Sequence, residues 1–143
     1  MSDSPLASPD TDPLAARYDF AKRVALEAAE RAMAFYVRRR DLAVEHKGGD
    51  LQDVVSIADQ QVEAFIRSEL ATHFPDDGVV GEEGGSAGLQ ARYIWVIDPI
   101  DGTACFLNGL HNWCVSIGLL VDGEPLLGAI ADPNHGELFH GFV

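Results

Sequence analysis

The spacing of apolar residues predicts two helices in the first half of the chain. The segment from Leu14 to about Asp41 is rich in Ala, Glu, Arg and Leu and contains no Gly or Pro, which favours one long helix. We expect its buried side to contain Tyr18, Leu26, Phe35 and Tyr36. From about Ser56 to Phe74, apolar residues recur at steps of three and four, which predicts a second, amphipathic helix. Polar residues, including Glu63 and Arg67, occupy its other faces.

The second half of the chain has the shorter period of β-strands. The runs VVGE and YIWVID are typical of strands, and the Gly-rich segment GGSAGLQ between them predicts a loop. Three later runs, CVSIGLLV, LLGAIA and ELFHGFV, predict a meander that turns at residues 122–123 and at DPNHG. Helices followed by hairpins favour an α+β fold, a layered helix/sheet sandwich, over a doubly wound sheet.

Length and charge then limit the classes of function. With 143 residues, 47% of them hydrophobic, the chain suits one globular domain, which we place at residues 14–143 behind a disordered tail at residues 1–13. A net charge of −13 opposes binding to nucleic acid or to an anionic membrane. The first residues lack a signal-peptide pattern and the longest apolar run, VSIGLLV, is too short to cross a bilayer, so we expect a cytoplasmic protein.

The segment WVIDPIDGT carries the most informative chemistry. It ends an apolar strand with two carboxylates, Asp98 and Asp101, followed by Gly102 and the hydroxyl of Thr103. Pro99 keeps the residue before it extended, so both carboxylates can turn toward one point. Two carboxylates, a carbonyl and a hydroxyl form an all-oxygen set that suits Mg²⁺. A short helix beginning near Thr103 would direct free N–H groups at a phosphate beside that metal.

A second acidic segment, GEEGG, follows the strand-like run that ends at Gly81. Neighbouring residues of an extended chain face opposite ways, so only one of Glu82 and Glu83 is expected to enter the same site. Both segments also have a purely structural interpretation, in which Asp101 caps a helix, Asp98 starts a turn and the acidic loop is a solvated turn. A phospho-aspartate mechanism of the haloacid-dehalogenase type is disfavoured, because Asp98 and Asp101 are three positions apart instead of the two in D-x-D-G-T.

Three motifs together resemble those of the inositol monophosphatase family of metal-dependent phosphomonoesterases. They are D-x-x-S-x-A-D at residues 53–59, G-E-E at 81–83, and W-V-I-D-P-I-D-G-T at 95–103 with Phe106 after it, in the family's order and spacing. The resemblance implies a Mg²⁺-dependent enzyme that hydrolyses a small phosphorylated polyol or sugar, such as inositol monophosphate, by attack of metal-activated water. It also implies two or more Mg²⁺ ions, which Mn²⁺ could replace, and a homo-oligomer, since family members are commonly dimers.

The same resemblance implies which residues bind the metal ions. One Mg²⁺ would be surrounded by Glu82, Asp98, the carbonyl oxygen of Ile100 and Thr103. A second would be bound by Asp98 and Asp101. Paired metal ions stabilise both the attacking and the leaving oxygen of an in-line displacement, so this set suits hydrolysis without a covalent phosphoenzyme.

Further roles follow for the residues around the metal ions. Asp59 and Thr103 would orient the attacking water, while Gly102 and Thr103 would hold the substrate phosphate. Lys47 falls near a lysine that borders the family's site, although its spacing to the first motif is one residue longer.

The family's second half has no counterpart in this sequence. That half supplies a Trp-Asp motif with a further metal-binding Asp and much of the substrate pocket, so we expect the chain to correspond to the N-terminal half of the family domain. The substrate therefore stays open among inositol monophosphate, fructose bisphosphate, histidinol phosphate and phosphoadenosine phosphate. The alternative function is a truncated, non-catalytic module that binds a cation or a partner protein through its acidic surface.

Overall fold

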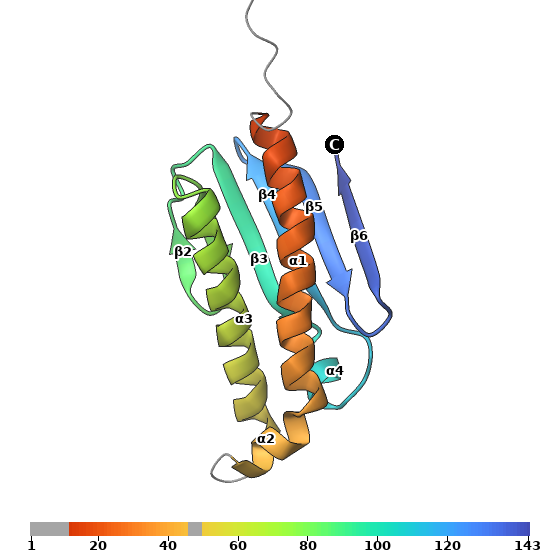
Figure 1. Ribbon diagram of the computed structural model, residues 1–143. Helices are drawn as coiled ribbons and strands as arrows, with labels where there is room; N and C mark the ends of the chain where they lie inside the picture. Colours follow the sequence, from red (N-terminus) through yellow and green to blue (C-terminus); the bar gives the residue numbers. More distant parts are fainter. Residues whose placement is uncertain (1–11, 46–49) are drawn as a thin grey trace, which may run out of the picture.

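A layer of helices covers one face of a six-stranded sheet in the computed structural model, which describes residues 12–45 and 50–143 (Figure 1). The helices are α1 (Pro13–Val37), α2 (Arg39–Glu45), α3 (Leu51–His73) and α4 (Thr103–Leu107). The strands are β1 (Gly78–Gly81), β2 (Gly85–Ala87), β3 (Tyr93–Asp101), β4 (Cys114–Val121), β5 (Glu124–Asp132) and β6 (Glu137–Phe142).

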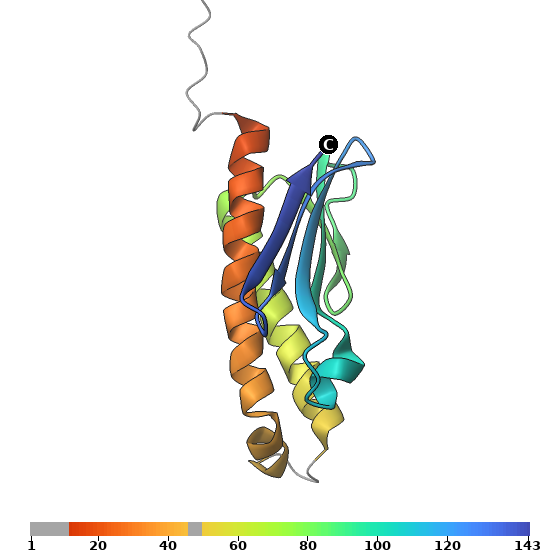
Figure 2. The ribbon, with the colours of Figure 1, turned by 90° about the vertical axis from the view of Figure 1, so that its right-hand side faces the viewer.

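The order of the strands is β2-β1-β3-β4-β5-β6, and all neighbours are antiparallel except β1 and β3. Helices α1 and α3 contact each other and lie on the same face of the sheet, as the turned view shows (Figure 2). The predicted α+β fold with separate helix and sheet layers is therefore confirmed. Within the two described ranges, none of the helices combines the length and apolarity needed to cross a membrane.

Helix α1 packs against the sheet mainly through small side chains. Its buried residues are Phe20, Ala21, Val24, Ala25, Ala28, Ala29, Ala32 and Tyr36. Of the residues expected on this side, Tyr36 is buried, Tyr18 and Phe35 are half-buried, and Leu26 is 46% exposed. The expectation for Leu26 is wrong because alanines form the inward face, and their small side chains let the helix backbone approach its neighbours closely.

The ends of the two long helices also differ from the predicted ones. The first helix was expected to continue to Asp41, but α1 ends at Val37 and a separate helix, α2, begins at Arg39. Arg39 Nη1 donates a hydrogen bond of 2.8 Å to the carbonyl of Tyr36, so a side chain satisfies one of the free carbonyls at the end of α1. Helix α3 begins five residues earlier than predicted, because Asp50 caps it by accepting the N–H of residue 52 at 2.8 Å.

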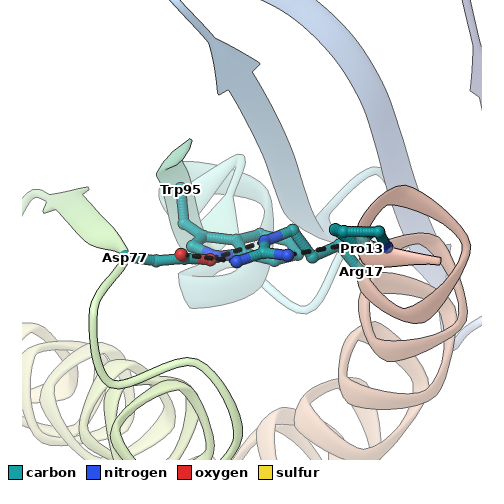
Figure 3. Close-up of polar contacts among 4 residues, drawn as sticks. All are labelled: Pro13, Arg17, Asp77 and Trp95. Atoms are coloured by element: carbon teal, nitrogen blue, oxygen red, sulfur yellow. Dashed lines mark hydrogen bonds and ion pairs between the residues drawn. The ribbon is translucent and has the colours of Figure 1, made fainter. Parts of the chain in front are cut away.

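One buried ion pair joins three segments that are distant in the sequence. Arg17 of α1 donates to Asp77 from Nε at 2.8 Å and from Nη2 at 2.7 Å, and Trp95 Nε1 of β3 donates to the same carboxylate at 2.9 Å (Figure 3). Arg17 also donates to the carbonyl of Pro13 at 3.0 Å. The side chain of Asp77 is 4% exposed, so its charge depends on these donors. The pair therefore fixes α1 against β3 and the turn that follows α3.

The Gly-rich segment predicted as a loop contains the short edge strand β2. It pairs antiparallel with β1, with Val79 opposite Ala87. All residues of β2 are exposed, so the strand lacks the apolar alternation that would have revealed it in the sequence.

Candidate active site

A one-residue bulge in β3 brings two carboxylates to the same face of the sheet. Asp98 lies opposite Ser116 of β4 and Asp101 lies opposite Cys114, so three steps along β3 match two steps along β4. Residues two apart on a strand share a face, and each residue shares its face with the one opposite it, so Asp98 and Asp101 point to the same side. Pro99 lies inside the bulge, where its missing N–H leaves no ladder donor unpaired.

Asp98 has an incompletely satisfied carboxylate. Its Oδ1 is buried and accepts no hydrogen bond from any residue in the described ranges. The pKa of Asp98 is raised to about 6, first by burial and then by the negative charges of Glu82 and Asp101, while a backbone hydrogen bond at Ile100 acts in the opposite direction. The charges of Glu82 and Asp101 thus both disfavour the ionised form of Asp98.

Asp59 enters the same region from the helix layer. It lies on α3, is 5% exposed, and its Oδ1 also lacks a hydrogen-bond partner within residues 12–45 and 50–143. Its pKa is raised to about 7, first by burial and then, in decreasing order, by the charges of Glu83, Asp98, Glu82 and Glu63. We call the carboxylates of this region the acidic cluster: Asp59, Glu63, Glu82, Glu83, Asp98 and Asp101.

The charges of both Glu residues after β1 affect the aspartates of the acidic cluster, while the expectation that only one of them enters the site stays a prediction. Strand β1 ends at Gly81, and Glu82 and Glu83 lie in a turn, so the alternation of an extended chain does not apply to them. Among the neighbouring charges, Glu82 has the largest effect on the pKa of Asp98, and Glu83 has the largest effect on that of Asp59.

The segment after Asp101 is shaped by a glycine. Gly102 has φ 95° and is itself the N-cap residue of α4, so the simpler interpretation in which Asp101 caps this helix is wrong. A Cβ at Gly102 would lie 2.7 Å from the carbonyl oxygen of Asn112, so only glycine fits here without displacing the chain. Thr103 follows as the first residue of α4 and is exposed.

The acidic cluster is not preformed as a coordination shell. Within the described ranges, no three His, Cys, Asp or Glu side chains converge closely enough to hold a metal ion as they stand. The buried oxygens of Asp59 and Asp98 nevertheless lack partners, and burial and mutual repulsion raise the pKa of both groups. A hard divalent cation would supply what these oxygens lack, so the donor set fits Mg²⁺ or Mn²⁺.

A shallow pocket adjoins the cluster on its Asp101 side. Its lining residues are Asp101, Gly102, Asn112, Trp113, Cys114, Ile130, Asp132 and Phe139. The pKa of the Cys114 thiol is raised to about 11, first by burial and then by the charges of Asp101, Asp98 and Asp132. The thiol therefore stays protonated at neutral pH and is a poor nucleophile.

Glu63 is an acidic residue of this region that its pattern in the sequence did not reveal. Glu63 was assigned to the polar side of α3, but it is 2% exposed, which corrects that assignment. The only signal in the sequence was its position four residues after Asp59, which puts both on one helix face. Lys47 lies outside the described residues.

Comparison with known proteins gives a family match over nearly the whole chain. The model of the inositol monophosphatase family matches residues 13–143. Inositol monophosphatase 3 of Solanum lycopersicum is 38% identical over 127 residues, covering 82% of this chain and 46% of that protein. Histidinol-phosphatase of Chlorobaculum parvum (strain DSM 263 / NCIMB 8327) is 41% identical over 120 residues, with the same two coverages.

The fold has a counterpart among solved structures. Inositol monophosphatase from Anabaena (Nostoc) sp. PCC 7120 is similar with a TM-score of 0.76 and 34% sequence identity, covering 92% of this chain and 45% of that one. The chain thus spans less than half the length of the relatives that it matches.

Proposed function

The chain belongs to the inositol monophosphatase family, and on that premise we propose that it forms the metal-binding part of a Mg²⁺-dependent phosphomonoesterase. The observation that carries the proposal is the acidic cluster, in which Asp59 and Asp98 each keep a buried oxygen unpartnered among the described residues. An anionic phosphate could approach such a cluster only when cations neutralise it.

We assign the metal ligands to the oxygen donors of the loop after β1 and the end of β3. One ion would be bound by Glu82, Asp98, the Ile100 carbonyl and Thr103, and a second by Asp98 and Asp101. The shared face of Asp98 and Asp101 and the effect of Glu82 on Asp98 support this assignment. When bound, the ions supply charge stabilisation of the phosphate oxygens and lower the pKa of water. Mn²⁺ accepts a similar oxygen donor set.

Asp59 is proposed to orient the attacking water and to accept its proton at Oδ1. This oxygen is buried within the acidic cluster and hydrogen-bonds to no other residue in the described part of the chain. A pKa near neutrality suits a group that takes up a proton and releases it again at physiological pH. Thr103 would share the orientation of the water through its hydroxyl.

Gly102 and Thr103 are proposed to hold the substrate phosphate. Gly102 brings the backbone close to Asn112 without a side chain in the way, and Thr103 begins α4 directly afterwards. Backbone N–H groups at such a turn can donate to phosphate oxygens. The phosphate would then lie beside the carboxylates of β3, which is the arrangement that in-line attack requires.

The proposed substrate is a small phosphorylated polyol or sugar, with inositol monophosphate as the first candidate. The names of two relatives support this class, since one is an inositol monophosphatase and the other a histidinol-phosphatase. A homo-oligomer remains part of the proposal. The exposed side chains of Phe139 and Phe142 on the edge strand β6 would favour self-association, which light scattering at several concentrations would test.

Metal binding is the direct test of the site. We expect Mn²⁺ and Mg²⁺ titrated into the 143-residue chain to bind, and Asp98→Asn to weaken that binding strongly. Asp122→Asn is the matched control, because Asp122 lies in the turn between β4 and β5, where it pairs with Arg92 at 3.3 Å. Its φ of 51° is one that Asn tolerates. Equal affinity in the parent chain and Asp98→Asn would overturn the assignment.

Hydrolysis separates the enzyme from the alternative function. Phosphate release would be measured with inositol monophosphate, fructose bisphosphate, histidinol phosphate and phosphoadenosine phosphate in the presence of Mg²⁺. The alternative, a non-catalytic cation- or protein-binding module, is motivated by the acidic cluster not being preformed within the described residues. Metal binding with no release from any of these compounds would favour that module. Release that requires both Mg²⁺ and Asp101 would favour the phosphomonoesterase.

A further inference from the structure

Glu63 is a buried carboxylate to which the proposed chemistry gives no task. It lies one helical turn after Asp59 on α3 and is 2% exposed. A buried carboxylate is costly unless hydrogen bonds and an opposite charge compensate for the lost water. For Glu63 that compensation comes from Arg67 and from the loop that carries Glu82 and Glu83.

The two oxygens of Glu63 contact the backbone of this loop. Oε1 accepts a hydrogen bond from the N–H of Glu83 at 3.2 Å, and Oε2 accepts one from the N–H of Gly84. Both donors follow Glu82 directly in the chain. The contacts therefore restrict how the backbone turns at Glu82, and with it the direction of the Glu82 side chain.

Arg67 completes the attachment from the same helix. Its Nε lies 3.2 Å from Glu63 Oε2, and its Nη2 donates to the carbonyl of Gly85. Glu63 and Arg67 together contact the backbone of three consecutive residues, 83–85. The side chain of Glu82 is left free of this attachment, and its charge acts on Asp98.

The glycines that flank the two Glu residues fit this arrangement independently. A Cβ at Gly81 would overlap Oε1 of Glu63, and a Cβ at Gly84 would lie 2.8 Å from Nε of Arg67. Neither contact is possible for a real Cβ without displacing the pair. The absence of side chains at these two positions thus lets the loop lie directly on the Glu63–Arg67 pair.

We propose that Glu63 is a positioning residue that, together with Arg67, holds the loop after β1 so that Glu82 faces the metal site. This inference rests on the proposed function, because it gives Glu63 its effect through a metal ligand. Groups that support a metal ligand typically change metal affinity by roughly 10- to 100-fold when they are replaced. Glu63 itself contacts neither metal nor substrate in this proposal.

The test is the Mn²⁺ affinity of Glu63→Gln, measured by calorimetry or by the free-ion signal in electron paramagnetic resonance. Gln keeps the volume of Glu but places an NH₂ group against a backbone donor, so one loop contact is lost. We expect the dissociation constant for Mn²⁺ to rise about 10-fold. Glu69→Gln is the matched control, because Glu69 lies on the same helix but pairs with Arg23 and His73.

A double-mutant cycle distinguishes positioning from a general structural role. If Glu63 acts through Glu82, the effect of Glu63→Gln should vanish in a Glu82→Gln background and persist in an Asp101→Asn background. Hydrogen exchange of the metal-free chain gives a second measurement. The backbone amides of residues 83 and 84 should exchange faster in Glu63→Gln, whereas the amides of the β4 core should not change.

The possible outcomes separate this inference from the proposed function. If Glu82→Gln weakens Mn²⁺ binding but Glu63→Gln does not, Glu63 is not a positioning residue and the metal site stands. If Glu63→Gln weakens Mn²⁺ binding equally in the Glu82→Gln and Asp101→Asn backgrounds, the inference is also overturned, because its effect is then independent of Glu82. If Glu82→Gln and Asp98→Asn both bind Mn²⁺ like the parent chain, the metal site is wrong and the inference fails with it. Should Glu63→Gln not fold, Arg67→Lys replaces it, because Lys retains the charge but cannot contact both Glu63 and the carbonyl of residue 85. This variant must show a smaller loss of Mn²⁺ affinity, which again vanishes in the Glu82→Gln background.

Discussion

The negative charge of Asp98, three residues before the end of β3, helps to raise the pKa of Asp59, which lies on α3 in the other layer of the fold. Burial is the largest cause for both residues, and together with the neighbouring negative charges it raises the pKa of Asp59 to about 7 and that of Asp98 to about 6. Two carboxylates with such values are partly protonated near neutral pH. Their protonation therefore links the stability of the metal-free chain to pH.

The first prediction concerns that link. The pKa values of both groups are higher in the folded chain than the ordinary value of 3.8, so between about pH 4 and pH 7 the folded chain holds protons that the unfolded chain has released. The free energy of unfolding from these groups must then fall as the pH rises through this window. We expect Asp59→Asn to be more stable than the parent chain at about pH 8, by an amount on the order of a few kcal/mol, and to lose most of this advantage at about pH 5.

Urea unfolding with a chelator present, at both pH values, measures this effect. Asp122→Asn serves as the control, since it removes an exposed carboxylate and should keep the pH dependence of the parent chain. A stability difference between Asp59→Asn and the parent chain that is the same at both pH values would contradict the prediction.

The second prediction concerns the attacking water. With saturating Mg²⁺, Thr103→Ala should lower kcat for a phosphomonoester by roughly 10²- to 10⁴-fold with little change in KM, because the variant removes the hydroxyl assigned to the water and the metal ion but keeps the backbone N–H assigned to the phosphate. Thr72→Ala is the matched control, since Thr72 lies near the far end of α3 and its hydroxyl donates to the carbonyl of Ser68 at 3.0 Å. Steady-state kinetics of the two variants check the assignment, and equal kcat values would remove Thr103 from the mechanism.

The third prediction concerns the ion pair between Arg17 and Asp77. Asp77→Asn should lower the free energy of unfolding by about 3–5 kcal/mol, because it leaves a buried guanidinium without its counter-charge. Glu45→Gln, which breaks an exposed pair with Arg38, should change it by less than about 1 kcal/mol. Asp77 lies before β1, whereas Glu82 and Glu83 of the acidic cluster lie after the opposite end of that strand. The Mn²⁺ affinity of Asp77→Asn should therefore equal that of the parent chain. Denaturant unfolding and calorimetry test both parts, and a small stability change would show that the pair is dispensable.

The fourth prediction compares two glycines with similar backbone angles. Gly102 has φ 95° and Gly123 has φ 83°, but a Cβ would lie 2.7 Å from the Asn112 carbonyl only in the first case and would meet nothing within 4 Å in the second. In both Ala variants, backbone strain should lower the free energy of unfolding by about 1 kcal/mol. Gly102→Ala should lose more than Gly123→Ala and should also weaken phosphate binding, because Thr103 follows directly. Similar stabilities and similar phosphate affinities would show that the close approach does not matter.

Local patterns in the sequence were enough for most of the elements and for the central motif. The recurrence of apolar residues in α3 and the alternation in β3 to β5 depend on which face of one element is buried, and a single segment carries that information. The segment WVIDPIDGT likewise keeps Asp98, Asp101 and Thr103 within a few residues of one another. Their closeness along the chain needs no long-range contact, so the sequence alone was enough to propose them as one group.

The tertiary structure decided the features that depend on a partner distant in the chain. The bulge that turns Asp98 and Asp101 to one side exists only in the pairing of β3 with β4, and the strand β2 exists only because β1 lies beside it. Leu26 is exposed because neighbouring alanines take the inward face of α1, and Glu63 is buried because the loop after β1 covers it. Burial and strand register are properties of two surfaces in contact, so the pattern of one segment alone could not determine them.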